Sequence, residues 1–295
     1  MLLKTLKIGN LSIQVPIIQG GMGVGISLSG LASAVANEGG VGVISAAGLG
    51  VIYKNLSKNY LEASILGLKE ELSKARQKTQ GVIGVNIMVA LSNFADLVRT
   101  AIAEKADIIF AGAGMPLNLP SFLQKDSTTK LVPIVSSGRA AKLICEKWKS
   151  IYNYLPDALV VEGPKAGGHL GFSREQLNEI DTMDYDEEIR QIIACKEEYE
   201  KRYEKKIPVI VAGGIFDKMD IEHAFELGAD GVQIASRFVA TEECDASESY
   251  KLAYINAKEE DVQIIQSPVG MPGRAIRNAL IERVEKEKEP IKKCY

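Results

Sequence analysis

One histidine lies in a glycine-rich segment that directly follows an apolar run. His169 occurs in VEGPKAGGHLG, and histidine exchanges a proton near neutral pH. It is therefore a candidate general base, or a group that orients a substrate. Glu162 comes seven residues earlier, where the apolar run ends. Its carboxylate is a candidate acceptor for cofactor hydroxyl groups, the alternative being an ion pair with Lys165. The other histidine, His223, lies inside an outward-facing helical pattern and is given a structural role.

A second candidate functional segment is the glycine cluster in IIQGGMGVGIS, residues 17–27. Glycine-rich loops after strands often bind phosphate, but this one does not fit the dinucleotide pattern G-x-G-x-x-G, because Ile26 occupies the position of the last glycine. The next apolar run, in VGVISAAG, also lacks the acidic residue that would bind a ribose. The cluster is therefore not a dinucleotide turn.

Eight short apolar runs, separated by helical patterns, must position these residues. Each run is apolar throughout, as expected for parallel strands that are buried on both faces. The runs are residues 15–19, 41–45, 82–88, 107–114, 131–137, 158–163, 207–214 and 231–236. Eight alternating units predict an α/β protein, a (β/α)8 TIM barrel with a small C-terminal appendage. An open doubly wound sheet is the weaker alternative.

The intervening segments predict helices with recognisable ends. Residues 27–40 (SLSGLASAVANEGG) begin with serines suited to capping and end at Gly39. Residues 218–230 place apolar side chains on one face and end at Gly228. The charged stretch 174–206 predicts a solvated outer helix in preference to an acidic metal site.

The residues after the runs are nearly all glycine, alanine or serine, which leaves a wide floor where a flat ligand can approach the backbone. In a barrel the active site lies at these carboxyl ends, and a phosphate usually binds after the seventh and eighth strands. Here those loops contain Gly213, Gly214, Ala235 and Ser236. Arg237 either adds charge there or pairs with a carboxylate of an outer helix.

Composition argues against several other classes of protein. The chain has 295 residues, 46% hydrophobic and 25% charged, and a net charge of −3, which indicates no nucleic-acid or membrane partner. Four cysteines about fifty residues apart (Cys145, Cys195, Cys244 and Cys294) and two histidines indicate neither a disulfide framework nor a metal site. No signal peptide or membrane span is recognisable, so a cytoplasmic location is expected. A homodimer is left open.

Residues 1–240 are expected to form the barrel and residues 241–295 an extension packed on it. Within the extension, TEECDAS (241–247) predicts a loop. Residues 267–289 predict a turn rich in proline and glycine followed by a helix of mixed charge.

Several of these motifs together resemble the FMN-dependent nitronate monooxygenases, formerly called 2-nitropropane dioxygenases, whose superfamily includes FMN-dependent enoyl-acyl-carrier-protein reductases. The motifs are PIIQGGM, GVNIM, GAG, EGPKAGGHLG, IPVIVAGGI, GADGVQIASRF and CDAS, in order from residue 15 to about residue 246. The resemblance implies a barrel with one FMN over its mouth and His169 beside the flavin. The cofactor-binding residues that it implies are Gly21, Met22 and Gly23 near the ring, Asn86 at its edge, Glu162 and Gly168 close by, and Gly213, Gly214, Ala235 and Ser236 at the phosphate.

The chain departs from the family pattern at the phosphate turn, where A-S replaces the commoner G-T; Ser236 keeps the hydroxyl group. Related chains often continue into a cysteine-containing tail, which leaves open whether the native chain extends beyond Tyr295 and whether Cys294 has a role.

Three functions remain open from the sequence. The first is oxidation of small alkyl nitronates by O2. The second is NAD(P)H-dependent reduction of enoyl-acyl-carrier-protein or quinones, for which Arg274, Arg277 and Lys293 are a weakly indicated docking surface for an acidic carrier. The third is a non-catalytic flavin-binding barrel, in which His169 would have no obvious use.

Overall fold

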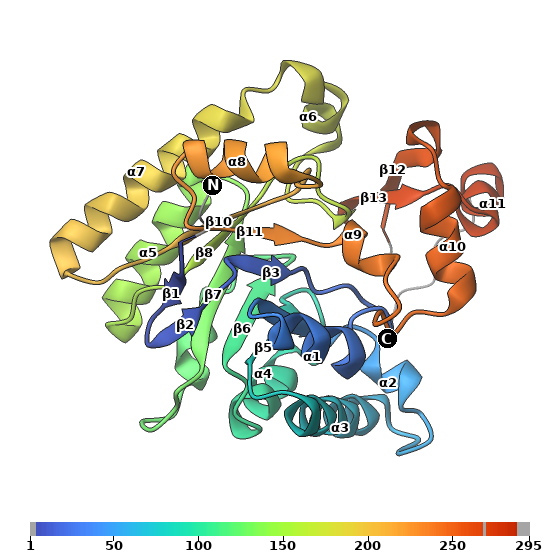
Figure 1. The fold of residues 1–295 in the computed structure, drawn as a ribbon, viewed down its shortest axis with the longest axis horizontal. Helices are drawn as coiled ribbons and strands as arrows, with labels where there is room; N and C mark the ends of the chain where they lie inside the picture. The colour runs from blue at the N-terminus through green and yellow to red at the C-terminus, as the bar shows by residue number, and fades with distance from the viewer. Residues whose placement is uncertain (1–3, 268–269, 288–295) are drawn as a thin grey trace.

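The barrel predicted from the eight apolar runs is present and closed. The computed structural model describes residues 4–267 and 270–287, and side chains to residue 284. Its parallel strands follow the order β3-β4-β5-β6-β7-β8-β10-β11 around a closed barrel (Figure 1), which excludes the open doubly wound sheet. The strands are β3 (Ile17–Gln19), β4 (Val41–Ser45), β5 (Val82–Met88), β6 (Ile108–Gly112), β7 (Lys130–Val135), β8 (Leu159–Glu162), β10 (Val209–Ala212) and β11 (Gly231–Ile234).

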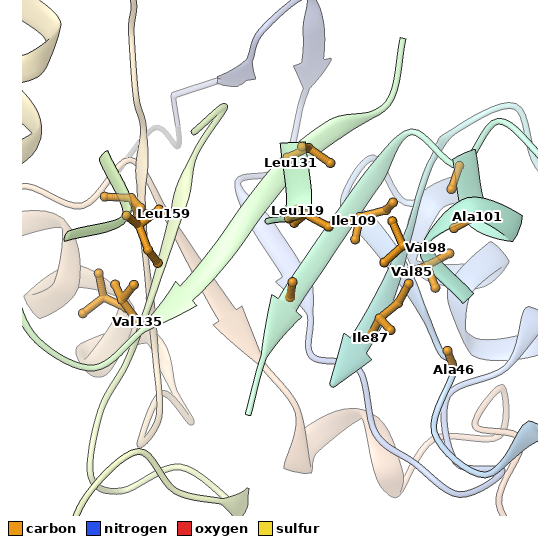
Figure 2. Close-up of a cluster of buried hydrophobic side chains, with 14 of the residues drawn as sticks. Ala46, Val85, Ile87, Val98, Ala101, Ile109, Leu119, Leu131, Val135 and Leu159 are labelled. Atoms are coloured by element: carbon orange, nitrogen blue, oxygen red, sulfur yellow. The ribbon is translucent and has the colours of Figure 1, made fainter. Parts of the chain in front are cut away.

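Helices cover the outside of the barrel, and alternate strand residues pack against them. Figure 2 shows Val85 and Ile87 of β5 and Ile109 of β6 near Val98 and Ala101 of a neighbouring helix, all members of one buried cluster. The helical elements are α1 (Ser29–Asn37), α2 (Leu49–Ile52), α3 (Tyr60–Lys78), α4 (Phe94–Ala103), η1 (Leu119–Phe122), α5 (Gly138–Tyr152), α6 (Arg174–Asn178), η2 (Ile180–Thr182), α7 (Tyr185–Tyr203), α8 (Lys218–Glu226) and α9 (Ser236–Val239). The outer helix predicted within residues 174–206 is therefore confirmed as α7, preceded by the short α6.

A second buried cluster fills the barrel interior. An antiparallel hairpin, β1 (Leu6–Ile8) and β2 (Leu11–Ile13), contributes Leu6, Ile8 and Ile13 to it. The sequence analysis did not predict this hairpin, although apolar residues alternate on both sides of Gly9-Asn10. Its strands of three residues are too short for a periodic pattern to indicate them.

The residues after β11 form more regular structure than a loop, a turn and a helix. They contain α10 (Glu248–Asn256), η3 (Glu259–Asp261), β12 (Val262–Gln266), β13 (Pro272–Ile276) and α11 (Ala279–Glu287), which gather on one side of the barrel (Figure 1). The segment predicted as a proline- and glycine-rich turn therefore contains a strand. β13 pairs antiparallel with β12 and with β9 (Gly168–His169), a pairing across about a hundred residues that no local pattern indicates.

Helix α1 corrects the expectation of serine capping. Its N-cap is Leu28, and no N-cap side chain bonds the first turn. Instead Asp245 accepts hydrogen bonds from the N–H groups of Leu28 and Leu31, and Glu71 accepts one from Ser29. A negatively charged carboxylate interacts more favourably with the positive end of the helix dipole than a neutral hydroxyl group does. Residues 241–247 form the expected loop, which thereby joins the C-terminal residues to the barrel.

Within the described residues, no helix has the length and apolar character that a membrane span requires. The same part of the chain contains no group of three potential metal-ligating side chains.

Candidate active site

Polar side chains replace apolar ones inside the barrel at the carboxyl ends of the strands, which we call the rim. Val43 and Val160 belong to the inner cluster, whereas their neighbours Ile44 and Val161 belong to the outer one. Because side chains alternate along a strand, the inner face of the next layer carries Ser45 and Glu162. The same alternation on β5 turns Asn86 inward. The rim therefore presents a polar layer above an apolar interior.

Two predicted residues, Gly21 and Asn86, are in close contact across this layer. A Cβ atom added at Gly21 would lie 2.3 Å from the Cβ atom of Asn86, so a side chain at position 21 would displace the asparagine. At Gly23 an added Cβ would lie 2.9 Å from the Cβ of Ala47. The glycines of this loop thus let the backbone approach the rim more closely than any side chain would allow.

The predicted phosphate residues come from adjacent strands. β10 and β11 are paired, and both Gly213 and Gly214 have positive φ angles, of 90° and 85°. A Cβ added at Gly20 would lie 3.1 Å from the Cβ of Ala235, so the loop after β3 borders this region. Ser236 is exposed and begins the short helix α9. The structure therefore brings the glycine loop and the phosphate residues to one side of the rim.

Gln19 and Ser27, which the sequence analysis missed, fix the shape of the glycine loop. Gln19 is fully buried; its Oε1 accepts from the N–H of Val43, and its Nε2 donates to Ser27 Oγ, each at 2.9 Å. Ser27 Oγ also accepts from the N–H of Met22 at 2.9 Å. A buried glutamine at the end of an apolar strand was the available signal, because burying an amide requires partners.

Glu162 lies at the end of β8 with its side chain half-buried in the rim. Burial raises the pKa of its carboxyl group from 4.5 to about 7. Its backbone carbonyl accepts a hydrogen bond from the Tyr185 hydroxyl at 2.9 Å. Among the described residues its carboxyl group has no hydrogen-bond or ion-pair partner, so the alternative pair with Lys165 is not formed. The carboxyl group is free to accept bonds from a ligand.

His169 lies in the segment of residues 163–171, which we call the histidine loop and which is bonded to the rim at both ends. The loop begins with Gly163, whose N–H donates to Ala212 O at the end of β10. It ends at Gly171, whose carbonyl accepts from Ser136 Oγ just after β7. The imidazole is half-buried, and this burial lowers its pKa below 6.5, so the ring is neutral at neutral pH.

The glycines around His169 in the sequence favour a flexible loop, but the histidine lies in a short strand. His169 belongs to strand β9, where it pairs with Gly273 of β13, and the next N–H, from Leu170, donates to Pro272 O at 2.9 Å. Gly168, with a φ of 74°, supplies the positive φ just before the histidine. The C-terminal residues thus hold the candidate histidine in place.

Three other predicted residues have contacts that define their roles more closely. The Met22 side chain packs against a small cluster that contains Ile26, Val239 and Cys244. Arg237 donates to Phe216 O at 3.0 Å and lies over the Phe216 ring, and among the described ion pairs none joins it to a carboxylate. His223 is exposed on α8, 2.9 Å from Asp186, in agreement with a structural role.

The predicted basic docking surface is not a single exposed face. Arg274 is half-buried and bonded to backbone carbonyls, whereas Arg277 is exposed and paired with Glu282. Lys293 and Cys294 lie outside the described residues.

Comparison with known proteins places this chain in a family. The family model for nitronate monooxygenase matches residues 4–295. A probable nitronate monooxygenase of Staphylococcus aureus (strain MSSA476) is 27% identical over an alignment of 309 residues, gaps included. The alignment covers 93% of this chain and 78% of the relative.

Two solved structures extend the comparison. FabK from Thermotoga maritima has a TM-score of 0.71 at 29% identity, with 94% of this chain and 76% of FabK covered. The nitroalkane oxidase of Streptomyces ansochromogenes has a TM-score of 0.73 at 19% identity, with 95% and 82% covered, which supports the fold alone. Because the family model matches nearly the whole chain, the protein belongs to the nitronate monooxygenase family of oxidoreductases.

Proposed function

We propose that this protein is an FMN-dependent enzyme that oxidises small alkyl nitronates with O2. The observation that carries the proposal is the strand pairing that holds His169 in a loop bonded at both ends to a rim of small and polar residues, and burial lowers the pKa of its imidazole. Family membership and the relative from Staphylococcus aureus support the same activity.

The rim suits a flat cofactor with a phosphate at one end. The contact between Gly21 and Asn86 supports a ring lying against the backbone of the glycine loop, with Asn86 at its edge. Gly213 and Gly214, whose positive φ angles turn the backbone after β10, would hold the phosphate together with Ala235 and Ser236. The unpartnered carboxyl group of Glu162 suits the cofactor's hydroxyl groups. When bound, FMN would supply the electron transfer.

His169 would act on the substrate in one of two ways. A nitronate is already deprotonated at carbon, so the imidazole needs only to orient its nitro group. A neutral nitroalkane must first lose a proton, and a neutral imidazole is able to accept it. Because burial lowers the pKa of His169, the base remains available at neutral pH. We therefore expect the neutral nitroalkane to depend on His169 more strongly than the nitronate does.

The second candidate is an NAD(P)H-dependent flavin reductase acting on enoyl-acyl-carrier-protein or quinones. Its support is FabK from Thermotoga maritima, which at 29% identity is somewhat closer in sequence than the Staphylococcus aureus relative at 27%. In this reading His169 would orient the acceptor.

The test is the flavin absorbance spectrum of the purified protein, recorded anaerobically after addition of a nitronate, NADH or NADPH. Bleaching by the nitronate, without bleaching by either nicotinamide, is the expected result. Rapid bleaching by a nicotinamide alone would instead establish the reductase. A colourless protein that takes up no added FMN would contradict both, and a yellow protein that responds to no addition would support the non-catalytic barrel.

A further inference from the structure

Arg274 of β13 is a cation whose surroundings differ from those of the neighbouring basic residue. Its Nη1 atom donates to Pro164 O at 2.6 Å and to Ala166 O at 2.7 Å, both within the histidine loop. The side chain is half-buried, and among the described ion pairs none joins Arg274 to a carboxylate. A guanidinium group loses hydration when it is buried, so its contacts with two loop carbonyls indicate a specific positional role.

The strand register places Arg274 directly behind the histidine. His169 pairs with Gly273, and Arg274 pairs with Gly168. Because adjacent residues of a strand point to opposite faces, the side chains of Arg274 and His169 leave opposite faces of this small sheet. Arg274 thus bonds the loop before the histidine from one face, and the imidazole extends from the other.

Within the loop, the Ala166 N–H also donates to Gly163 O at 3.1 Å and its side chain packs with Leu170 and Leu177, whereas the two glycines that follow have no such contacts. A Cβ atom added at Gly167 or Gly168 would meet no atom within 4 Å, so this part of the loop borders open space. Two glycines also allow the backbone many alternative conformations. The strand pairing at His169 and the Arg274 bonds to Pro164 and Ala166 therefore restrict the backbone on either side of these two glycines.

We propose that Arg274 is a positioning residue that fixes the histidine loop and thereby holds the His169 imidazole over the rim. The inference rests on the proposed function only for the catalytic consequence of the position of the His169 imidazole. The position itself is measurable without enzyme turnover. Arg277, three residues along, provides a matched control, because it is 57% exposed and paired with Glu282.

The first test is a histidine NMR titration of the FMN-loaded protein. The chain has two histidines, so the ring signals of His169 and His223 are assignable with the variants H169N and H223N. We expect R274Q to raise the apparent pKa of His169 toward 6.5, because a loosened loop readmits water, and to leave His223 unchanged. R277Q should change neither signal. R274K should give a smaller shift of the His169 pKa than R274Q, since one ammonium group is able to donate to both carbonyls.

A salt comparison distinguishes positioning from the simple loss of a charge. The part of a charge effect that acts through solvent is screened at about 0.5 M salt, whereas a displaced loop remains displaced. The expected result is a shift that persists at high salt. A shift that disappears with salt, an unchanged His169 titration in R274Q, or equal shifts of both histidines would overturn the proposal.

Kinetics then test the consequence for the reaction. R274Q should lower kcat/KM for a neutral nitroalkane by about 10- to 100-fold, because a base displaced by about 1 Å loses this much. The value for the corresponding nitronate should fall much less, with flavin content unchanged. Equal losses of kcat/KM on both substrates, accompanied by a loss of bound flavin, would mean that Arg274 has a purely structural role. If the wild-type protein oxidises neither substrate, the proposed function fails, while the NMR result still decides the position of His169.

Discussion

The two ends of the barrel use carboxylates in opposite ways. At the amino end an aspartate precedes each of β6, β8 and β11, and its carboxylate accepts the N–H of a residue at the start of the neighbouring strand. The pairs are Asp107 with Ile83 at 2.8 Å, Asp157 with Leu131 at 2.8 Å and Asp230 with Val209 at 2.9 Å. In each pair the aspartate N–H also donates to the carbonyl of the same residue, at 2.8 to 3.0 Å.

At the carboxyl end the acidic residue has no such partner. The Glu162 carboxyl group is buried enough to raise its pKa to about 7, and no described group donates to it. His169 is likewise held neutral by burial alone. The comparison shows that satisfied polar groups join the strands at one end, whereas the other end keeps polar groups available for a ligand. Stability and activity should therefore respond separately to mutation at the two ends.

The largest expected effect is at the carboxyl end. His169→Ala should lower kcat/KM for a neutral nitroalkane by about 10²- to 10⁴-fold, because it removes the proton acceptor. The nitronate, which needs only orientation, should lose far less, and the urea unfolding midpoint should stay close to that of the wild type. His223→Ala is the control, since that ring is exposed on α8 and should not affect either substrate. Equal losses on both substrates would argue against a role in proton transfer.

The next effect is on stability at the amino end. Asp157 also accepts from the Tyr154 hydroxyl and from Lys205 Nζ, the latter at 3.0 Å, and its side chain is 7% exposed. Asp157→Ala leaves all these donors without their partner, and we expect a loss of about 3 kcal/mol in the free energy of unfolding.

The same substitution at the other two aspartates tests whether burial sets the size of this effect. Asp107 and Asp230 are 25% and 42% exposed, so Asp107→Ala should cost less than Asp157→Ala, and Asp230→Ala about 1 kcal/mol or less. Urea denaturation measures the series, and kcat per bound flavin should remain unchanged throughout. A variant that loses activity without losing stability would contradict the separation of the two ends.

A smaller effect is expected from filling the space at Gly21. In Gly21→Ala the new Cβ would overlap the Asn86 side chain, and relieving this overlap should weaken FMN binding by about tenfold, equivalent to about 1.4 kcal/mol. Gly167→Ala is the matched control, because its added Cβ meets nothing within 4 Å. Quenching of FMN fluorescence measures the affinity. Equal affinity in the two variants would mean that the ring does not lie against this loop.

The sequence predicts the barrel and its rim well, because both follow from local patterns. Apolar runs of five to eight residues identify the strands, and the residues after each run necessarily meet at one end of the barrel. Gly21, Asn86 and Glu162 could be assigned to the rim in this way.

The support of His169 and the cap of α1 were not predictable by the same means. Strand β9 has two residues and depends on β13, and the carboxylate at the start of α1 comes from Asp245, more than two hundred residues away. Contacts of this kind depend on tertiary packing, which leaves no periodic signal in either segment. The Gln19 network was indicated by its residue type, but its partners were visible only in the fold.

The smallest effect gives the sharpest comparison between the two ends. It concerns whether an ionised carboxylate raises or lowers the free energy of unfolding. In the protein without cofactor, Glu162 ionises at about pH 7, whereas in the unfolded chain it ionises near 4.5. Between these values the folded state keeps a proton that the unfolded state has lost. Wild-type stability therefore falls as pH rises through this window, by at most about 1.4 kcal/mol per pH unit.

Glu162→Gln removes this dependence, since the amide does not titrate. Because the side chain is partly open to water, we expect the glutamine variant to be about 1 kcal/mol more stable than the wild type above pH 7 and equal to it near pH 4.5. Urea midpoints of both cofactor-free proteins across this pH range measure the difference. A variant less stable than the wild type at every pH would mean that Glu162 accepts bonds as Asp157 does. A gain that grows between about pH 4.5 and pH 7 and is constant above would show that the carboxyl end retains an acidic group at a cost in stability, as a site for a ligand requires.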